Sequence, residues 1–269
     1  MLNVLVVIHE RTVGESPACA GLLEQDREDV RILIYDNSES DFGIREACAE
    51  RGWTCLGGEG NRGLSAAYNA ALEHVSAEDP SGHLCLLDDD TTLPQTFLAD
   101  MKKGVSAWPD TILLPILRQD EKILSPWIEK RTVRFFSSPE ECMAADPKDL
   151  YAFNSGMVLP PEVIASYRYD GRLFLDCVDY SFLDAMKHAN RPLRVVPVVC
   201  GQHFSGKEKP SAEKAMTRFA IYVRDMRIYY ENEEKTGEAR LLKRALHLAL
   251  LYRTAQPFIL LKKKPDREH

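Results

Sequence analysis

Three consecutive aspartates, Asp88, Asp89 and Asp90, form the sharpest chemical feature of the sequence. They follow the apolar run Leu84–Leu87, which predicts a buried strand, and they precede a helix expected to open at Pro94. Adjacent bare carboxylates repel one another, and oxygen ligands suit Mg²⁺ or Mn²⁺. In extended backbone Asp88 and Asp90 point the same way. The triplet therefore predicts a metal site that also holds a diphosphate; a solvated acidic turn that caps the next helix is the alternative.

A second pair of carboxylates, Asp176 and Asp179, lies among apolar neighbours and is three residues apart. On a helix these two side chains would share one face. Because burial raises the pKa of a carboxyl group, such a pair suits general-base chemistry, with either residue as the base. The alternative is that Asp176 caps the N-terminus of the helix.

Three further segments are candidates for ligand binding. Gly58–Gly63 matches the G-x-G-x-x-G pattern, but it follows the third expected strand and not the first, so it predicts a glycine-rich turn better than a dinucleotide site. The stretch Asn154-Ser155-Gly156 is strand-like and needs a small residue, for close approach of a ligand or for a plain bulge. His203 follows a strand and is either a ligand of a metal or phosphate or a structural side chain.

The elements that would position these residues alternate between strand and helix. Apolar runs predict strands at Val4–Ile8, Val30–Tyr35, Trp53–Leu56, Leu84–Leu87 and Thr111–Leu117, with helices over 16–25, 42–51, 64–76 and from Pro94. This order predicts an α/β fold with a Rossmann-like, mostly parallel central sheet flanked by helices. Ligands bind beyond the carboxyl ends of such strands, where Asp36 and the aspartate triplet lie.

The rest of the chain is less regular. Residues 118–150 predict an irregular, flexible lobe. Strands are expected at Tyr151–Leu159 and Leu193–Val199, and a helix, or a strand leading into one, at Phe174–His188. From residue 211 the pattern is helical, with breaks near Gly237 and Pro257. We therefore expect one main domain at residues 1–210, which would hold the catalytic site, and a C-terminal helical appendage at residues 211–269.

Composition excludes several classes. Of 269 residues, 45% are hydrophobic, which excludes a disordered chain, and the net charge of −7 argues against a general nucleic-acid binder. None of the seven cysteines forms a C-x-x-C pair, which disfavours a zinc ribbon. The first residues predict a strand and not a signal peptide, and no apolar run reaches about 18 residues. We expect a cytoplasmic protein.

The charge is unevenly distributed. Residues 240–269 hold eight basic and two acidic residues, so the rest of the chain is strongly acidic. Apolar segments beside Lys262-Lys263-Lys264 predict peripheral contact with an anionic membrane surface. The alternative is a helix that packs on the domain and has a solvated end.

Over residues 3–232 these segments together resemble the family 2 glycosyltransferases, which have the GT-A fold. The resemblance rests on eight segments in the same order as in the family. They are Val4–Ile8, Tyr35–Ser38, Asn61–Asn69, Leu86–Asp90, Asn154–Gly156, Leu173–Tyr180, the surroundings of His203 and the helix Tyr222–Tyr230. The N-x-G…N and D-x-V-D elements look most like the rhamnosyltransferase-type branch. The turn Ile8–Thr12 departs from the family pattern, which leaves the contacts of His9 and Arg11 open.

The resemblance implies an inverting, metal-dependent transferase of the hexosyltransferase type. It would move one sugar from a dTDP- or UDP-sugar to the hydroxyl of a saccharide or lipid-linked saccharide, in cell-surface polysaccharide or lipopolysaccharide synthesis. The nucleotide sugar would bind to residues 1–117 and the acceptor to 118–210, on the inner face of the cell membrane if the tail docks there. The Q-x-x-R-W element of processive synthases is absent. A nucleotidyltransferase, an NAD-dependent oxidoreductase and an inactive nucleotide-sugar-binding module are the competing hypotheses.

The same resemblance implies roles for single residues. Asp179 would be the general base. Binding of the nucleotide sugar would fall to Asp36, Asn61, Gly63, Asn69, Asp88 and Asp89, and binding of Mg²⁺ or Mn²⁺ to Asp88, Asp90 and His203. Ser155, Gly156 and Asp176 would lie on the acceptor side.

Overall fold

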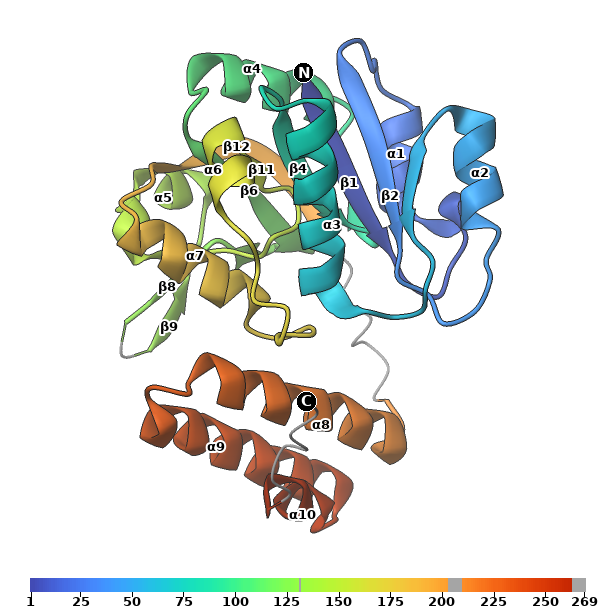
Figure 1. Ribbon diagram of the computed structural model, residues 1–269. Helices are drawn as coiled ribbons and strands as arrows, with labels where there is room; N and C mark the ends of the chain where they lie inside the picture. Colours follow the sequence, from blue (N-terminus) through green and yellow to red (C-terminus); the bar gives the residue numbers. More distant parts are fainter. Residues whose placement is uncertain (131, 203–209, 263–269) are drawn as a thin grey trace.

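A mostly parallel sheet occupies the centre of the computed structural model, which describes residues 1–130, 132–202 and 210–262 (Figure 1). The strand order is β3-β2-β1-β4-β11-β6-β12-β5, with β7 beside β6. Its strands are β1 (Leu2–Ile8), β2 (Val30–Asp36), β3 (Thr54–Gly57), β4 (His83–Asp88), β5 (Thr91–Thr92), β6 (Ile112–Gln119), β7 (Lys122–Ser125), β11 (Val158–Leu159) and β12 (Leu193–Gln202). The short strand β11 is antiparallel to both β4 and β6.

Helices cover both faces of this sheet (Figure 1). Strand β1 is buried over its whole length, and its side chains alternate between two apolar clusters, one on each face. One cluster packs under α1 (Pro17–Leu23), α2 (Ile44–Arg51) and α4 (Phe97–Ala107). The other packs under α3 (Gly63–Glu78), α5 (Pro139–Ala144), α6 (Pro161–Ser166) and α7 (Val178–His188). The predicted α/β fold with helices on both faces of a mostly parallel sheet is confirmed.

The prediction of an irregular lobe over 118–150 is wrong. This region forms β7, α5, a short 3₁₀ helix (Pro147–Asp149) and a three-stranded sheet of order β10-β8-β9, made of Leu150–Tyr151, Trp127–Glu129 and Val133–Phe135. The strand predicted at Tyr151–Leu159 is split, because its ends pair in two different sheets. Strands of two to four residues show too little periodicity to be recognised, and their pairing partners define them.

Three C-terminal helices lie beneath the sheet domain (Figure 1): α8 (Ala212–Tyr229), α9 (Glu234–Tyr252) and α10 (Gln256–Lys262). The breaks between them fall at 230–233 and 253–255, a few residues before the predicted ones. Gly237 lies inside α9, where a Cβ atom would come 2.8 Å from Cβ of Tyr230. The glycine therefore permits close packing of α9 on the end of α8, and it does not break the helix.

Helix α8 contacts the sheet domain, α9 and α10, and Arg240 of α9 also pairs with Glu129 of β8. The buried α8 side chains Met216, Phe219, Val223 and Met226 belong to the same apolar cluster as α3 and α7. The division of the chain at residue 210 stays a prediction, but α8 packs as part of the main core. Within the described residues, no helix has the length and apolar character needed to cross a membrane.

Candidate active site

Two cavities meet at the carboxyl end of the central sheet, and both are lined by Asp88, Leu64, Leu175 and Arg218. The carboxylate cavity, of about 750 Å³, includes Asn61, Gly63, Asp88, Asp89, Asp90, Gln202, Lys214 and Arg218 in its wall. The aromatic cavity, of about 370 Å³, includes Asp88, Phe153, Asn154, Asp176, Asp179, Tyr180, Arg218, Tyr222, Tyr229, Tyr230 and Arg240. Asp88 therefore faces both spaces.

The turn that carries the aspartate triplet is fixed by buried hydrogen bonds. Asp88 ends β4, and its backbone N–H donates to Oγ of Ser155 over 3.0 Å. The Ser155 hydroxyl is also 2.7 Å from Oγ1 of Thr91, which follows the triplet in β5. Nε2 of Gln202, at the end of β12, donates to Oδ1 of Asp90 over 2.6 Å. A turn residue, Ser155, and the end of β12 thus position Asp88 and Asp90.

Asp89 points toward the turn that follows β1. Its Oδ2 atom accepts a hydrogen bond from the backbone N–H of His9 (3.0 Å) and lies 3.2 Å from Nε of Arg11. These contacts give His9 and Arg11 a defined role, which the sequence pattern left open. Asp89 lines the carboxylate cavity, but its carboxylate is bonded to this turn, whereas Asp88 and Asp90 line the same cavity from the other side of the triplet.

The electrostatics of Asp88 fit a divalent cation. Burial raises the pKa of Asp88 to about 7, and repulsion from Asp90 and Asp89 adds to the rise. A bound cation would relieve both penalties, and carboxylate oxygens are the ligands that Mg²⁺ and Mn²⁺ prefer. The described residues hold no group of three acidic, His or Cys side chains arranged for a metal. His203, the third predicted ligand, lies outside the described residues.

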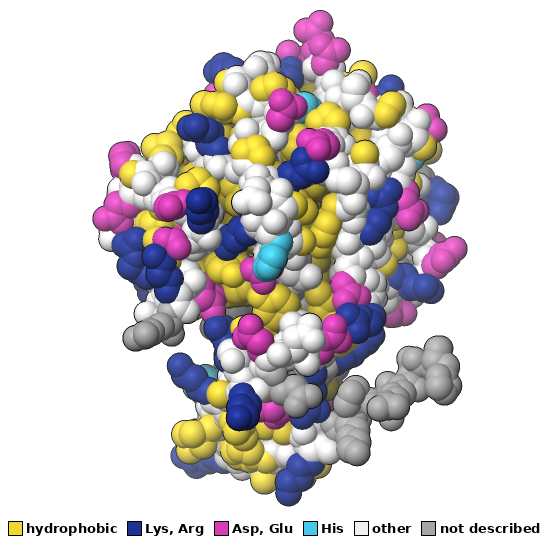
Figure 2. Space-filling model, turned by 60° about the vertical axis from the view of Figure 1, so that its left-hand side comes forward, with side chains coloured by type: hydrophobic (Ala, Val, Ile, Leu, Met, Phe, Trp, Pro, Cys, Tyr) yellow, Lys and Arg dark blue, Asp and Glu magenta, His cyan; other side chains and the backbone are white. Residues whose placement is uncertain are grey.

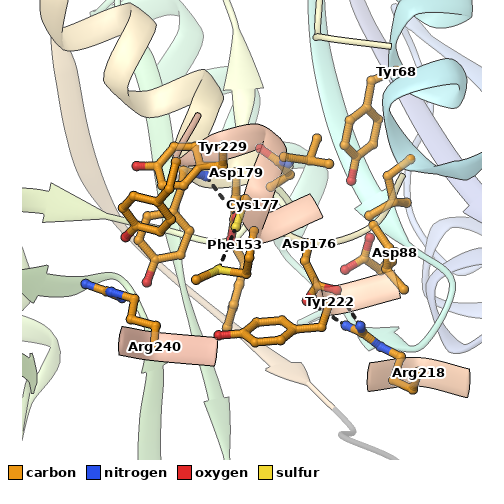
Figure 3. Close-up of a pocket in the computed structure, with 17 residues that line it drawn as sticks. Tyr68, Asp88, Phe153, Asp176, Cys177, Asp179, Arg218, Tyr222, Tyr229 and Arg240 are labelled. Carbon is orange, nitrogen blue, oxygen red and sulfur yellow. Dashed lines mark hydrogen bonds and ion pairs between the residues drawn. The ribbon is translucent and has the colours of Figure 1, made fainter. Parts of the chain in front are cut away.

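Asp179 lies in the first turn of α7 and faces the aromatic cavity (Figure 3). Burial raises the pKa of Asp179 to about 7, and the nearby Asp176 and Glu129 carboxylates add to the rise. A carboxylate with a pKa near neutrality in a cavity can accept a proton from a bound hydroxyl. Asp179 thus has the environment predicted for a general base.

The expectation that Asp176 and Asp179 share a helix face is wrong. Asp176 precedes α7, and Cys177, whose φ is 61°, occupies the N-cap position. This left-handed residue turns the chain between the two aspartates. Asp176 forms a bidentate ion pair with Arg218 of α8, in which Nη2 of Arg218 lies 2.7 Å from Oδ1 of Asp176 (Figure 3). The ion pair with Arg218 offsets the negative charge of Asp176.

The loop before α7 is held by a buried carboxylate from α8. Asp225 is 0% exposed and accepts hydrogen bonds from three consecutive backbone N–H groups, those of Phe174 (3.2 Å), Leu175 (2.8 Å) and Asp176 (2.8 Å). These bonds fix the segment that leads into the left-handed Cys177 and the base. Asp225 is therefore a positioning residue for Asp179.

Aromatic rings form much of the second cavity's wall. Phe153, Tyr180, Tyr222, Tyr229 and Tyr230 line it. The ring centroids of Tyr180 and Tyr229 lie 5.9 Å apart. The Tyr180 hydroxyl donates to Oε2 of Glu129 over 2.6 Å, and Oε1 of the same carboxylate pairs with Arg240 of α9. This cavity thus offers flat apolar faces beside the buried carboxylate of Asp179.

The remaining predicted residues fall into two groups. Asn61 and Gly63 line the carboxylate cavity, and Gly63 must be glycine because its φ is 81° and a Cβ atom would lie 2.5 Å from the Phe174 carbonyl oxygen. Asp36 and Asn69 are not among the described residues that line either cavity. The amide of Asn69 bonds both N–H and C=O of Tyr169, so it supports the neighbouring loop.

The two small residues expected on the acceptor side lie behind the cavities. Ser155 is buried and supports Asp88, as described above. Gly156 has a φ of 78°, and a Cβ atom there would lie 2.5 Å from Cγ of Pro115. The close approach predicted for this segment is thus made to β6 and not to a cavity.

Several site residues were not predicted. Lys214, Arg218, Tyr222 and Tyr229 of α8 line one or both cavities. They are spaced by four, four and seven residues, which places them on one face of a helix. That spacing was visible in the sequence, but nothing in it indicated that this face covers a site 40 residues away along the chain.

Comparison with known proteins decides the family. The sequence profile described as "Glycosyl transferase family 2" matches residues 17–157, more than half of the chain. The chain belongs to glycosyl transferase family 2. The matched region of this family 2 protein contains β2, the aspartate triplet and Ser155. No curated protein matches the sequence.

Solved structures share the fold. Residues 1–349 of TarS from S. aureus align with a TM-score of 0.52 and 13% identity, covering 84% of this chain and 65% of that one. The chain spans 39% of the longer TarS chain. The mannosyltransferase PcManGT from Pyrobaculum calidifontis, in complex with GDP-Man and Mn²⁺, aligns with a TM-score of 0.58 and 16% identity, covering 99% of this chain and 88% of that one. The predicted GT-A-like fold is confirmed.

Proposed function

We propose that this family 2 protein is an inverting, metal-dependent glycosyltransferase that transfers one sugar from a nucleotide-diphosphate donor to an acceptor hydroxyl. The observation that carries the proposal is Asp179, a carboxylate with a pKa raised to about 7, in a cavity that joins the aspartate triplet at Asp88. Direct displacement at an anomeric carbon requires a base near the attacking hydroxyl and a site for the diphosphate leaving group on the opposite side. The two adjoining cavities would supply one each.

The carboxylate cavity would hold the donor. Asp88 and Asp90 would bind Mg²⁺ or Mn²⁺, together with His203 if it reaches the cation. The cation, when bound, neutralises the charge of the diphosphate leaving group. Lys214 and Arg218 line the same cavity and would attract the phosphates. Asn61 and Gly63 would contact the nucleotide, and Asp36 would reach its base or ribose.

The aromatic cavity would hold the acceptor. Its rings would pack on the apolar faces of a pyranose, with the reacting hydroxyl toward Asp179. Asp179 would accept the proton as the acceptor oxygen attacks the anomeric carbon from the face opposite the diphosphate, so the configuration inverts. No covalent enzyme intermediate is needed, and Asp176 stays paired with Arg218 on the acceptor side.

The donor is proposed to be a dTDP- or UDP-sugar and the branch rhamnosyltransferase-type, in polysaccharide or lipopolysaccharide synthesis. TarS has been solved with UDP-GlcNAc and PcManGT with GDP-Man and Mn²⁺, so both uridine and guanosine donors occur among structures of this fold. These examples support a nucleotide-sugar donor.

A peripheral, cytoplasmic position at the membrane is also proposed. Leu242, Leu246 and Leu250 follow one stripe of α9 and are 52%, 53% and 72% exposed. Figure 2 shows hydrophobic side chains framed by Lys and Arg at the lower end of the molecule, where the C-terminal helices lie. Such a surface suits anionic lipid. Replacing Leu246 and Leu250 by Ser should reduce co-flotation with anionic vesicles; unchanged flotation would reject the contact.

A donor panel tests the main proposal. Thermal unfolding of the protein is measured with UDP-, dTDP- and GDP-sugars, with Mn²⁺ and with EDTA, and Asp88→Asn serves as the control variant. We expect one nucleotide class to raise Tm only with the metal, and only when Asp88 is present. If no nucleotide sugar gives metal-dependent stabilisation, the proposal is wrong. Stabilisation without transfer or hydrolysis would instead indicate an inactive binding module.

A further inference from the structure

Two cysteines that line neither cavity of the candidate active site lie on either side of the turn between α2 and β3. Cys48 is in the second half of α2, and Cys55 is in β3. The left-handed residue Gly52, with a φ of 65°, ends the helix, and the backbone N–H of Trp53 donates to the Cys48 carbonyl oxygen over 2.9 Å. The chain therefore reverses within a few residues, and β3 begins beside the end of α2.

The register of β3 on β2 places the two cysteine side chains on the same face of the sheet. Cys55 pairs with Ile34 of β2, and it packs against the apolar cluster under α1, α2 and α4, which contains both Ile34 and Cys48. The next pair, Leu56 and Tyr35, packs in the cluster on the opposite face. The Cys55 side chain therefore points toward α2, where its thiol forms a hydrogen bond with the Cys48 thiol.

Cys55 is the more reactive of the two thiols. All seven cysteines lie within the described residues, and six of them are buried, whereas Cys55 is partly exposed. The hydrogen bond from the Cys48 thiol lowers the pKa of Cys55 to about 7, although burial opposes this shift. The Arg45 guanidinium lowers the pKa further, and the Asp36 and Glu46 carboxylates act against it. The same hydrogen bond, together with burial, raises the pKa of Cys48. Near neutral pH the pair is thus an accessible thiolate beside a protonated thiol.

The guanidinium of Arg45 is held beside the strand that carries Cys55. Arg45 lies one turn before Cys48 on α2, and its Nη2 atom is 3.4 Å from the Gly57 carbonyl oxygen at the end of β3. The strand leads into the glycine-rich turn 58–63, which forms part of the wall of the carboxylate cavity. A covalent bond between the two cysteines would therefore tether to α2 the strand that enters this wall.

We propose that Cys48 and Cys55 form a redox site whose oxidant is a peroxide. The Cys55 thiolate attacks one oxygen of hydrogen peroxide, the O–O bond breaks, and Cys55 becomes a sulfenic acid while the second oxygen leaves as hydroxide. The Cys48 thiol then attacks the Cys55 sulfur, displaces its hydroxyl group as water and closes a disulfide. The two thiols lose two electrons and two protons, and the peroxide is reduced to two water molecules. A dithiol reductant reverses the reaction. The site is independent of the proposed glycosyl transfer.

Peptide mapping of the full chain tests the disulfide. Arg51 lies between the two cysteines, so trypsin separates residues 46–51 from residues 52–62 unless a disulfide joins them. The reduced native protein is treated with hydrogen peroxide near pH 7, its free thiols are blocked with iodoacetamide, and it is digested. We expect the two linked peptides to be the main oxidised product and dithiothreitol to restore both thiols. If these peptides do not link, or if either cysteine links to a different one, the proposal is wrong.

Alkylation of the untreated wild type tests the reactivity without any substitution. Burial raises the pKa of Cys19 and Cys142 to about 11 and that of Cys200 to about 12. Because the thiolate is the nucleophile, iodoacetamide near pH 7 should modify Cys55 at least tenfold faster than any other cysteine of the native protein. Modification of Cys55 at the same rate as the buried cysteines would overturn the assignment of Cys55 as the attacking thiol.

Variants test the order of the two steps. In Cys48→Ser the sulfenic acid at Cys55 has no partner, so it should accumulate and be trapped by dimedone, whereas in Cys55→Ser the Cys48 thiol should stay reduced. Cys19→Ala is the matched control, because Cys19 is a buried thiol near Cys48 on the same side of the sheet. This variant, with its fold verified by circular dichroism, should form the disulfide as the wild type does. No dimedone adduct in Cys48→Ser, or loss of the disulfide in folded Cys19→Ala, would contradict the mechanism.

Discussion

The carboxylate cavity and the aromatic cavity share a wall at Asp88 but differ in what completes them. The first is lined by carboxylates that repel one another, with Asp88 held partly protonated near neutral pH. The second is lined largely by aromatic rings, with Asp179 in its wall beside the Asp176–Arg218 ion pair. A ligand of the first must bring positive charge or a cation, whereas a ligand of the second must bring apolar faces and a hydroxyl. Changes in charge should therefore affect donor binding, and changes in ring area should affect the acceptor.

The two sides also differ in how their carboxylates are held. Asp88 and Asp90 are fixed by strand ends and by Ser155 and Gln202 of the same sheet domain. The loop before Asp179 is fixed instead by Asp225, from a helix about 50 residues further along the chain. The position of Asp179 therefore depends on packing of the C-terminal helices, and that of the aspartate triplet does not.

The largest effect is expected for Asp179→Asn. Loss of the base should lower kcat by about 10³-fold, within the range for general-base catalysis, while metal-dependent donor binding stays within about twofold. Transfer rates and donor-induced shifts in Tm measure the two quantities. Asp176→Asn is the comparison, because it removes a carboxylate that is already paired. If the Asp179→Asn variant transfers sugar at a normal rate, the proposal that the aromatic cavity holds the base and the carboxylate cavity holds the metal is wrong.

A smaller effect is expected for Asp225→Asn. The amide would keep one acceptor but would direct an N–H toward the backbone donors, so kcat should fall about 30-fold and the free energy of unfolding by about 1–3 kcal/mol. Because the carboxylate cavity is held separately, donor KM should change little. Arg224→Gln, an exposed neighbour on α8, is the control. An equal loss of donor affinity and kcat would show that α8 supports both cavities alike.

The pH dependence follows from the raised pKa of Asp179. Below about 7 this carboxyl group is protonated and cannot accept the acceptor proton, so kcat should rise about tenfold per pH unit between pH 5 and 6.5 and level off near 8. Folding takes up a proton at this group between pH 4 and 7, so the free energy of unfolding should fall as pH rises through that window. A flat rate profile from pH 5 to 8 would contradict the assignment.

The smallest effect is expected for Tyr222→Leu. The variant keeps apolar volume but removes the aromatic face, so acceptor KM should rise about five- to tenfold, which corresponds to about 1–1.4 kcal/mol. Donor KM and kcat should stay within about twofold. Steady-state kinetics with each substrate varied in turn would measure both constants. A rise in donor KM alone would indicate that Tyr222 contacts the donor and not the acceptor.

The sequence was sufficient to predict the position of a site residue where that residue directly follows a strand. Asp88 and Asp90 come immediately after a buried apolar run, so their place at the edge of the sheet could be predicted. The sequence was not sufficient where a site depends on a contact between residues that are far apart along the chain. The turn between Asp176 and Asp179 could not be predicted, because the left-handed conformation of Cys177 leaves no mark in residue type. Arg218 and Asp225 lie on an ordinary amphipathic face, and only the packing of α8 brings that face to the site.

Gly237 links the spacing of two helices to the size of the aromatic cavity. Its missing side chain lets α9 lie against Tyr230, and Arg240, one turn further, pairs with the Glu129 that holds the Tyr180 hydroxyl. A Cβ atom at position 237 would lie 2.8 Å from Cβ of Tyr230, so the two helices would have to shift and would move this wall with them. The breadth of acceptors that such an enzyme admits would then be adjustable at a residue that touches no substrate.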